Sequence, residues 1–128
     1  MASGAVLDSS AILAVIFNER GSSVVLPFLT GGLLSTVNLT EVLSRLLHRG
    51  AGADFSWRRL VDFGCEICLF DSHQARLAAE LIVQTRPHGL SLGDRACLAL
   101  AIQRKATVYT TDAAWKNLDL GIEVLVIR

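Results

Sequence analysis

The sequence predicts an α/β domain, a three-layer α/β/α sandwich built around a mainly parallel five-stranded sheet. Short apolar runs alternate with segments of helical periodicity along the chain of 128 residues. Parallel strands joined by helical crossovers produce this pattern, because each crossover returns the chain to the same end of the sheet. The length suits one compact domain, and a hydrophobic content of 52% is enough to build its core. We therefore expect residues 1–128 to fold as a single unit.

Five apolar runs are the predicted strands of this sheet. Each run is short and rich in aliphatic residues, as expected of strands that helices cover on both faces. The runs span residues 4–7, 33–36, 65–70, 107–110 and 123–127. Because a helical pattern follows most of these runs, we expect the carboxyl ends of the strands to lie along one edge of the sheet.

The segments between the strands carry helix signals. Capping residues followed by apolar residues three or four positions apart predict helices over about 11–17 and 38–49, and a third that ends at Gly64. A further helical stretch through residue 29 is weakened by Pro27. Two more helices, starting at Asp71 and Ser91, fall between the third and the fourth strand, so that crossover contains both of them.

The charge balance excludes recognition of nucleic acid through a general basic excess. Twelve lysines and arginines stand against twelve aspartates and glutamates, so any RNA contact has to rely on local patches, on metal ions or on both. Basic residues on polar helix faces are usually solvated charges, although some could steer RNA phosphates. The residues in question are Arg45, Arg49, Arg58, Arg59, Arg104 and Lys105.

The hydropathy pattern predicts a protein without a membrane segment. No apolar run approaches the roughly 20 residues that a membrane-spanning helix needs. The N-terminal stretch lacks a basic segment, and Asp8 interrupts its apolar run, so a signal peptide is not expected either. We therefore expect a cytoplasmic protein. The mean hydropathy of +0.46 is high for a monomer and predicts apolar surface that is buried against another chain.

The cysteines are predicted to be buried structural residues. Their number is odd, which argues against a disulfide framework. Cys65 and Cys68 have C-x-x-C spacing, but in a strand two residues three apart point to opposite faces and cannot share a zinc ion. The remaining cysteine, Cys97, falls on the apolar side of a predicted helix.

Four acidic residues occupy equivalent places relative to the predicted sheet. Asp8 and Asp112 follow strands, and Glu41 and Asp94 lie near the starts of helices. In a parallel sheet these positions face one crevice at the carboxyl edge of the strands. Carboxylates gathered there repel one another unless cations lie between them, and oxygen ligands of this kind suit Mg²⁺ or Mn²⁺. A carboxylate-held metal can activate water, so the acids together predict phosphodiester hydrolysis.

Each acid taken alone also has a purely structural explanation. Asp8 and Asp112 could simply cap helices. The two acids near helix starts have capping-box spacing to a polar residue three positions earlier, Asn38 in one case and Ser91 in the other. A helix cap is therefore the ordinary role for any one of them.

Two ion pairs along helices would give a similar structural role. Glu41 with Arg45, and Asp112 with Lys116, have the spacing of pairs that stabilise a helix turn. A joint metal site is favoured because each of the four acids either follows an apolar strand or lies near the start of a helix. All four can therefore face the same edge of the sheet.

Four segments, in order along nearly the whole chain, resemble the signature segments of PIN-domain ribonucleases, specifically of VapC-type toxins. They are VLDSSA at residues 6–11, NLTEV at 38–42, LSLGDRACLA at 90–99 and TTD at 110–112. The segment around Asp94 is the most specific of the four. The resemblance implies a PIN-like fold and a Mg²⁺- or Mn²⁺-dependent endoribonuclease. It also implies a homodimer that acts as the toxin of a toxin-antitoxin pair and is inhibited by its cognate antitoxin.

The resemblance also implies roles for individual residues. It places Asp8, Glu41 and Asp94 on the family's core metal-site acids, and Asp112 on its more variable fourth acid.

Three hydroxyl residues fall where the family has side chains that orient these carboxylates. The three candidates for these two positions are Ser9 for the first and either Thr110 or Thr111 for the second. A helix-capping role is equally open to the same hydroxyls.

Two other function classes are compatible with acids at strand ends. A receiver-like regulatory domain also binds Mg²⁺ there, but it needs adjacent early acids, a phospho-acceptor aspartate after the third strand and a late lysine. Asp8 has no acidic neighbour, Asp71 opens a helix, and Lys116 does not directly follow the fourth strand. A catalytically inactive PIN-like binding module is disfavoured because all four acids are present.

Overall fold

The computed structural model describes residues 4–128 and contains a five-stranded sheet in which every neighbouring pair of strands is parallel. The strands are β1 (Ala5–Leu7), β2 (Leu33–Ser35), β3 (Glu66–Cys68), β4 (Thr107–Thr110) and β5 (Val124–Val126). Each strand lies within the range predicted from its apolar run. Their order across the sheet is β3-β2-β1-β4-β5.

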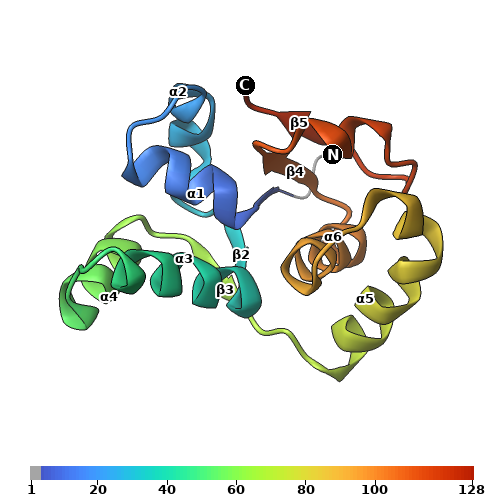
Figure 1. Cartoon of the computed structure of the whole chain (residues 1–128), viewed down its shortest axis with the longest axis horizontal. Helices are drawn as coiled ribbons and strands as arrows, with labels where there is room; N and C mark the ends of the chain where they lie inside the picture. The colour runs from blue at the N-terminus through green and yellow to red at the C-terminus, as the bar shows by residue number, and fades with distance from the viewer. Residues whose placement is uncertain (1–3) are drawn as a thin grey trace.

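Helices cover both faces of this sheet, with α1 to α4 on one side and α5 and α6 on the other (Figure 1). The helices are α1 (Ser9–Ile16), α2 (Ser22–Val25), α3 (Thr36–His48), α4 (Ala53–Asp62), α5 (Ser72–Thr85) and α6 (Leu92–Arg104). Short 3₁₀ turns are η1 (Leu26–Phe28), η2 (Arg86–His88) and η3 (Ala113–Asn117). The predicted three-layer α/β/α class and the two-helix crossover from β3 to β4 are confirmed. Within residues 4–128 no helix is both long enough and apolar enough to cross a membrane.

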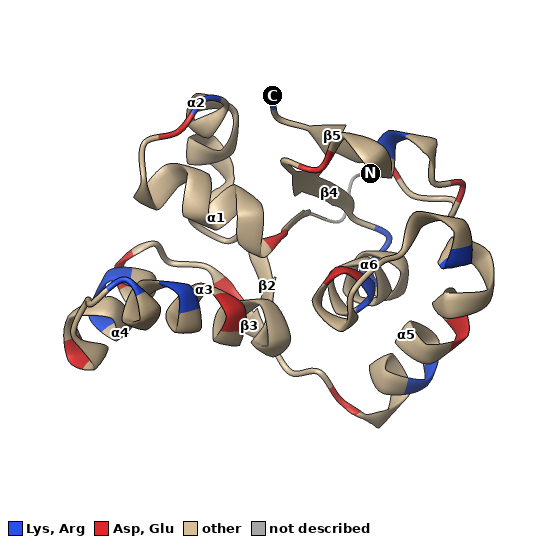
Figure 2. Ribbon diagram, viewed as in Figure 1, with Lys and Arg blue, Asp and Glu red and all other residues tan. Residues whose placement is uncertain are grey.

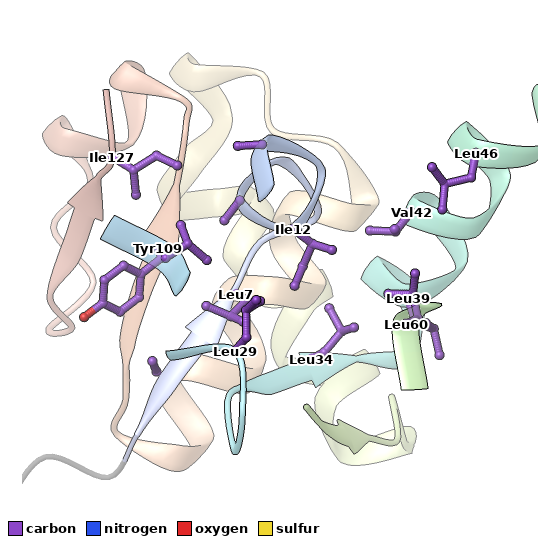
Figure 3. Close-up of a cluster of buried hydrophobic side chains, with 14 residues drawn as sticks. Leu7, Ile12, Leu29, Leu34, Leu39, Val42, Leu46, Leu60, Tyr109 and Ile127 are labelled. Atoms are coloured by element: carbon purple, nitrogen blue, oxygen red, sulfur yellow. The ribbon is translucent and has the colours of Figure 1, made fainter. Parts of the chain in front are cut away.

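Successive residues of the central strands point into two separate cores. Leu7 and Leu34 pack on the side of α1 and α3, whereas Val6 and Leu33 pack on the side of α5 and α6. Figure 3 shows Leu7 and Leu34, from neighbouring strands, beside Ile12 of α1. Burying an aliphatic side chain of this size contributes about 1.5–3 kcal/mol, so helix packing on both faces stabilises strands of only three or four residues.

The helix α6 is buried on nearly all sides because it lies between the sheet and α5. Residues 96–101 are each at most 1% exposed, including Leu98 and Ala99. A helix without a polar face has no amphipathic stripe to predict from. Its burial fixes the position of its first turn, which carries Asp94.

The helix α3 begins earlier than the sequence predicted. Its N-cap is Ser35, whose hydroxyl accepts a hydrogen bond from the Val37 N–H at 3.2 Å. The predicted start at Asn38 is therefore wrong, since Asn38 lies inside the first turn and Glu41 lies in the second. A serine with extended backbone at the end of a strand is a better cap than a residue already in the helix.

The three cysteines are free thiols, as predicted, but only Cys68 and Cys97 are buried, whereas Cys65 is partly exposed. Cys65 packs against the core on the side of α1 to α4, and Cys68 belongs to the core on the opposite side. The two thiols of the C-x-x-C segment therefore point to opposite faces of the sheet. This confirms that they cannot share a zinc ion.

The strand order excludes the receiver-like alternative. Receiver domains have the sheet order 2-1-3-4-5, whereas this sheet has the order 3-2-1-4-5. The two strand orders differ in the position of the switch point, where the chain moves its helices from one face of the sheet to the other. The ligand crevice opens at that position.

Candidate active site

The switch point of the sheet lies between the neighbouring strands β1 and β4, because the strands added after β1 lie on one side of it and those added after β3 lie on the other. From β1 the chain proceeds through β2 to β3 with helices on one face, and the crossover through α5 and α6 then returns it on the other face to β4. In open parallel sheets the ligand crevice lies at the carboxyl ends of the strands at such a switch point. Asp8 follows β1 and Thr110 ends β4, so both residues lie at this position.

Asp8 is buried at the centre of the site, with an exposed fraction of 4%. It occupies the N-cap position of α1, yet its side chain makes no capping hydrogen bond. Its Oδ2 instead accepts hydrogen bonds from the Ser10 hydroxyl at 2.6 Å and the Thr110 hydroxyl at 2.9 Å. The backbone N–H of Asp8 donates to the Tyr109 carbonyl at 3.0 Å, which ties β1 to β4 beside the carboxylate.

The hydroxyls around Asp8 differ in part from those expected. Thr110 contacts the carboxylate as expected, but the serine that does so is Ser10 and not Ser9. Thr111 contributes its backbone N–H, which donates to the Ser10 hydroxyl oxygen at 3.0 Å. Because α1 begins at Ser9, the second residue of the helix is the one turned toward β4.

Glu41 is held in place by the buried side chain of Asn38, for which the sequence predicts only a capping role. Asn38 Nδ2 donates to Glu41 Oε1 at 2.9 Å and to the Gly93 carbonyl at 3.0 Å, so it joins α3 to the start of α6. The carboxylate of Glu41 lies directly against Gly93, where any Cβ atom would overlap it. The only sequence signal for this link is the Asn-x-x-Glu spacing, which places both side chains on one helix face.

Asp94 forms the capping box that the sequence predicted. Its backbone N–H donates to the Ser91 hydroxyl at 3.1 Å, and the Ser91 N–H donates to Asp94 Oδ2 at 3.0 Å. The bond fixes one carboxylate oxygen at the N-terminus of α6. A capping role and a place in the site are therefore compatible for this residue.

Electrostatic interactions show that Asp8, Glu41 and Asp94 share one neighbourhood. The pKa of Asp8 is raised to about 6, with burial as the largest cause. The bonds from Ser10 and Thr110 lower this pKa, and the nearby charges of Asp94 and Glu41 raise it. The pKa of the buried Cys97 thiol is also raised, first by burial and then by the charges of the same three acids. Figure 2 shows acidic segments at α1, α3 and α6 around the middle of the molecule.

Asp112 stands apart from these three acids. Its Oδ1 accepts a hydrogen bond from the Ala114 N–H at 3.0 Å and so caps η3, while the residue itself is exposed. Its backbone N–H donates to the Thr110 hydroxyl oxygen at 3.1 Å, which keeps it near the site. The cap that the sequence allowed for Asp112 is present, and the structure does not bring its carboxylate into the group.

The two ion pairs considered for these helices are absent. Neither Glu41 with Arg45 nor Asp112 with Lys116 is among the ion pairs formed by residues 4–128. In each case the carboxylate is already engaged, with Asn38 or with a backbone N–H.

The site is compatible with a hard divalent cation, although its carboxylates are not drawn together. No three carboxylate, imidazole or thiol side chains of the described residues are positioned to hold an ion as they stand. Two observations fit a cation: the raised pKa of Asp8, and the buried Asn38 Oδ1, which has no hydrogen-bond partner within residues 4–128.

The fold and the acidic crevice define an α/β domain with a carboxylate site at its switch point. Residues 5–120 match the family model of the PIN domain, so the chain belongs to the PIN domain family. A comparison with proteins of curated function finds no significant match.

Several solved structures share the fold. A chain of the toxin-antitoxin complex from Klebsiella pneumoniae superposes with a TM-score of 0.75 at 14% identity, covering 98% of each chain. DNA-bound VapBC from Salmonella typhimurium gives a TM-score of 0.73 at 15% identity, again covering 98% of each chain. FitAcB from Neisseria gonorrhoeae gives 0.72 at 20% identity, covering 94% of this chain and 96% of the other.

The buried carboxyl of Asp8 predicts an unusual pH dependence of stability. Its pKa is about 6 in the folded protein against an ordinary value of 3.8, so ionisation opposes folding and stability falls as the pH rises between these values. Asp8→Asn removes this loss. In EDTA, its advantage in unfolding free energy over the parent should grow by about 2 kcal/mol between about pH 4.5 and pH 8.

Urea denaturation at the two pH values measures this difference. Asp71→Asn is the matched control, because Asp71 is exposed and caps α5 through the Gln74 N–H, which asparagine can also do. An Asp8→Asn protein whose stability relative to the parent does not change with pH would contradict the account of this carboxylate.

Proposed function

We propose that the chain is a Mg²⁺- or Mn²⁺-dependent endoribonuclease that acts in the cytoplasm as the toxin of a toxin-antitoxin pair. The observation that carries the proposal is the convergence of Asp8, Glu41 and Asp94 at the switch point of a PIN domain sheet. Phosphodiester hydrolysis is the chemistry that oxygen-held divalent cations support in such a crevice. We further propose that the single domain of residues 1–128 carries the whole activity.

The metal would be held by the three clustered carboxylates, with Asp112 as a variable fourth ligand. The set consists of oxygen atoms alone, which suits Mg²⁺ or Mn²⁺ rather than softer metals. A bound divalent cation supplies acidification of water and neutralises charge on the phosphate. Asp112 caps η3 through Oδ1 alone, so its Oδ2 would be the oxygen that takes part.

The remaining residues hold these carboxylates in place. Ser10 and Thr110 fix one oxygen of Asp8, and Asn38 fixes one oxygen of Glu41. Such partners determine the orientation of a ligand and commonly affect metal affinity by 10- to 100-fold, on the order seen for outer hydrogen bonds at metal sites. The free Oδ1 of Asn38 is positioned to accept one further hydrogen bond within the site.

Asp94→Asn should abolish RNA cleavage and leave the fold intact. The change removes one ligand charge but keeps the shape and the capping bond of the side chain. Cleavage of a labelled oligoribonucleotide in Mn²⁺ measures the activity, and circular dichroism measures the fold. Asp71→Asn, which makes the same chemical change at a distant cap, should cleave like the parent.

Two outcomes would overturn the proposal. Full cleavage by folded Asp94→Asn protein would remove Asp94 from the site. A parent protein that binds RNA and does not cleave it in Mn²⁺ would favour the inactive binding module instead.

We also propose an antitoxin partner that occupies an apolar groove and presents a basic side chain to the acids. The structures that share the fold include toxin-antitoxin complexes, which supports a partner of this kind. The groove is a cavity of about 160 Å³ between α3, α4 and β3, lined by Leu39, Trp57, Leu60, Val61, Cys65 and Ile67. An arginine at the acids would compete with the cation for the same carboxylates.

The lone chain should therefore arrest growth when expressed, and co-expression with the protein encoded beside it should relieve the arrest. Replacing C-terminal arginines of that neighbour by alanine should restore toxicity, as should Trp57→Asp in this chain if it weakens docking. Growth curves measure both effects. Complete inhibition by a neighbour that lacks its C-terminal segment would contradict this mechanism.

We further propose that the chain is a homodimer. Among the described residues, α3 offers one large exposed apolar side chain, Leu47, whereas α5 offers Ile82 and Val83 and α6 begins with the exposed Leu92. The α5 surface therefore supports the dimer better than α3 does. Light scattering at micromolar concentration measures the mass, and a monomer would contradict the dimer but not the nuclease.

A further inference from the structure

The face of α3 that carries Glu41 also carries arginines without a carboxylate partner. Glu41, Arg45 and Arg49 are four residues apart in turn, so they follow one another along one side of the helix. Neither arginine belongs to any ion pair formed by residues 4–128. In Figure 2 the blue segments of α3 continue from its acidic segment toward α4.

The absence of a bond between Glu41 and Arg45 has a structural cause. A glutamate four residues before an arginine is in the favourable order for a helix ion pair. Here the carboxylate is directed away by Asn38 and lies against Gly93. The helix thus separates its charges, with the carboxylate turned to the crevice and the guanidinium of Arg45 left for another ligand.

A cavity lies between Arg45 and Ser10, which is a hydrogen-bond partner of Asp8. It has a volume of about 180 Å³ and is lined by Arg45, Phe17, Ser10 and Thr111 among others. The hydroxyl of Ser10 donates to the Asp8 carboxylate, so the cavity adjoins the residues that surround this acid. Arg128 also lines it, but its charge is offset by Glu19 at 3.1 Å.

Two further arginines, Arg49 and Arg59, lie beside the cavity at the C-terminal end of α1. The Cζ atom of Arg49 lies 4.3 Å from the centre of the Phe17 ring, which holds the guanidinium in place. Arg59 Nη2 donates to the Ile16 carbonyl at 3.4 Å. Arg104, by contrast, is paired with Glu66 at 3.2 Å on a different part of the surface.

We propose that Arg45, Arg49 and Arg59 form a basic strip that binds consecutive phosphates of single-stranded RNA and leads the strand to the acids. This inference rests on the proposed function. Guanidinium groups bind phosphate oxygens well, and a strip of free arginines compensates for the absence of a net positive charge. A single strand is the fitting form, because Asp8 is almost fully buried in its crevice and the phosphate of an intact duplex is not free to enter it.

The test is the salt dependence of RNA binding for Arg45→Gln, Arg49→Gln and the double variant. Each is made in the Asp94→Asn protein so that the RNA stays intact, and fluorescence anisotropy gives Kd for a labelled oligoribonucleotide between about 50 and 200 mM KCl. Each substitution should weaken binding and make the slope of log K against log salt shallower by about 0.7. Loss of packing alone would not change that slope.

Arg76→Gln is the matched control. It removes the same charge from an exposed helix position, where Arg76 pairs with Glu80 on α5 at 3.5 Å, and should leave the slope unchanged. Slopes for Arg45→Gln and Arg49→Gln equal to that of the Asp94→Asn protein would overturn the strip, as would equal changes in all variants including the control.

The outcomes also separate this inference from the proposed function. Slopes that change as expected, together with no cleavage by the parent protein in Mn²⁺, would support the strip and overturn the nuclease. Cleavage by the parent with unchanged slopes in both arginine variants would support the nuclease and overturn the strip.

Discussion

The buried carboxylate of Asp8, at the junction of β1 and β4, is the constraint on which the site depends. Burial disfavours its ionised form, and two hydroxyl donors on Oδ2 offset only part of that cost, since the pKa remains near 6. The nearby charges of Glu41 and Asp94 add to the cost. A divalent cation would reverse both contributions, because it stabilises all three carboxylates at once. Relief of this charge repulsion would therefore favour binding of a cation.

The elements that carry the three acids are tied to one another around Asp8. The side chain of Asn38 on α3 donates to the Glu41 carboxylate on the same helix and to the Gly93 carbonyl on α6, so it joins the two helices. Gly93 lets these helices approach closely because it has no side chain. Burial of residues 96–101 fixes α6 against the sheet. The acids are therefore carried on rigid elements rather than on loops, which is the condition for a preorganised site.

The parts of the structure that depend on local sequence could be predicted, and the parts that depend on helix phase or distant contacts could not. The five strands and the Ser91–Asp94 capping box follow from short apolar runs and a three-residue spacing. Ser10 contacts the Asp8 carboxylate where Ser9 was predicted to do so, because a shift of one position along a helix turns a side chain by about 100°. The Asn38 contact with Gly93 joins residues 55 positions apart, and nothing in either local segment signals it. The lack of an ion pair between Arg45 and Glu41 could not be predicted either, because it depends on the direction in which the Glu41 side chain points.

Thermal unfolding in Mn²⁺ at pH 8 tests most directly whether three carboxylates share one cation. A cation that binds only the folded protein adds RT ln(1 + [L]/Kd) to its stability. We expect the melting temperature of the parent to rise with millimolar Mn²⁺ and to return with EDTA. The rise should be lost in Asp8→Asn, Glu41→Gln and Asp94→Asn alike, and kept in Asp71→Asn. A rise of the same size in the parent and in all three site variants would contradict a shared site.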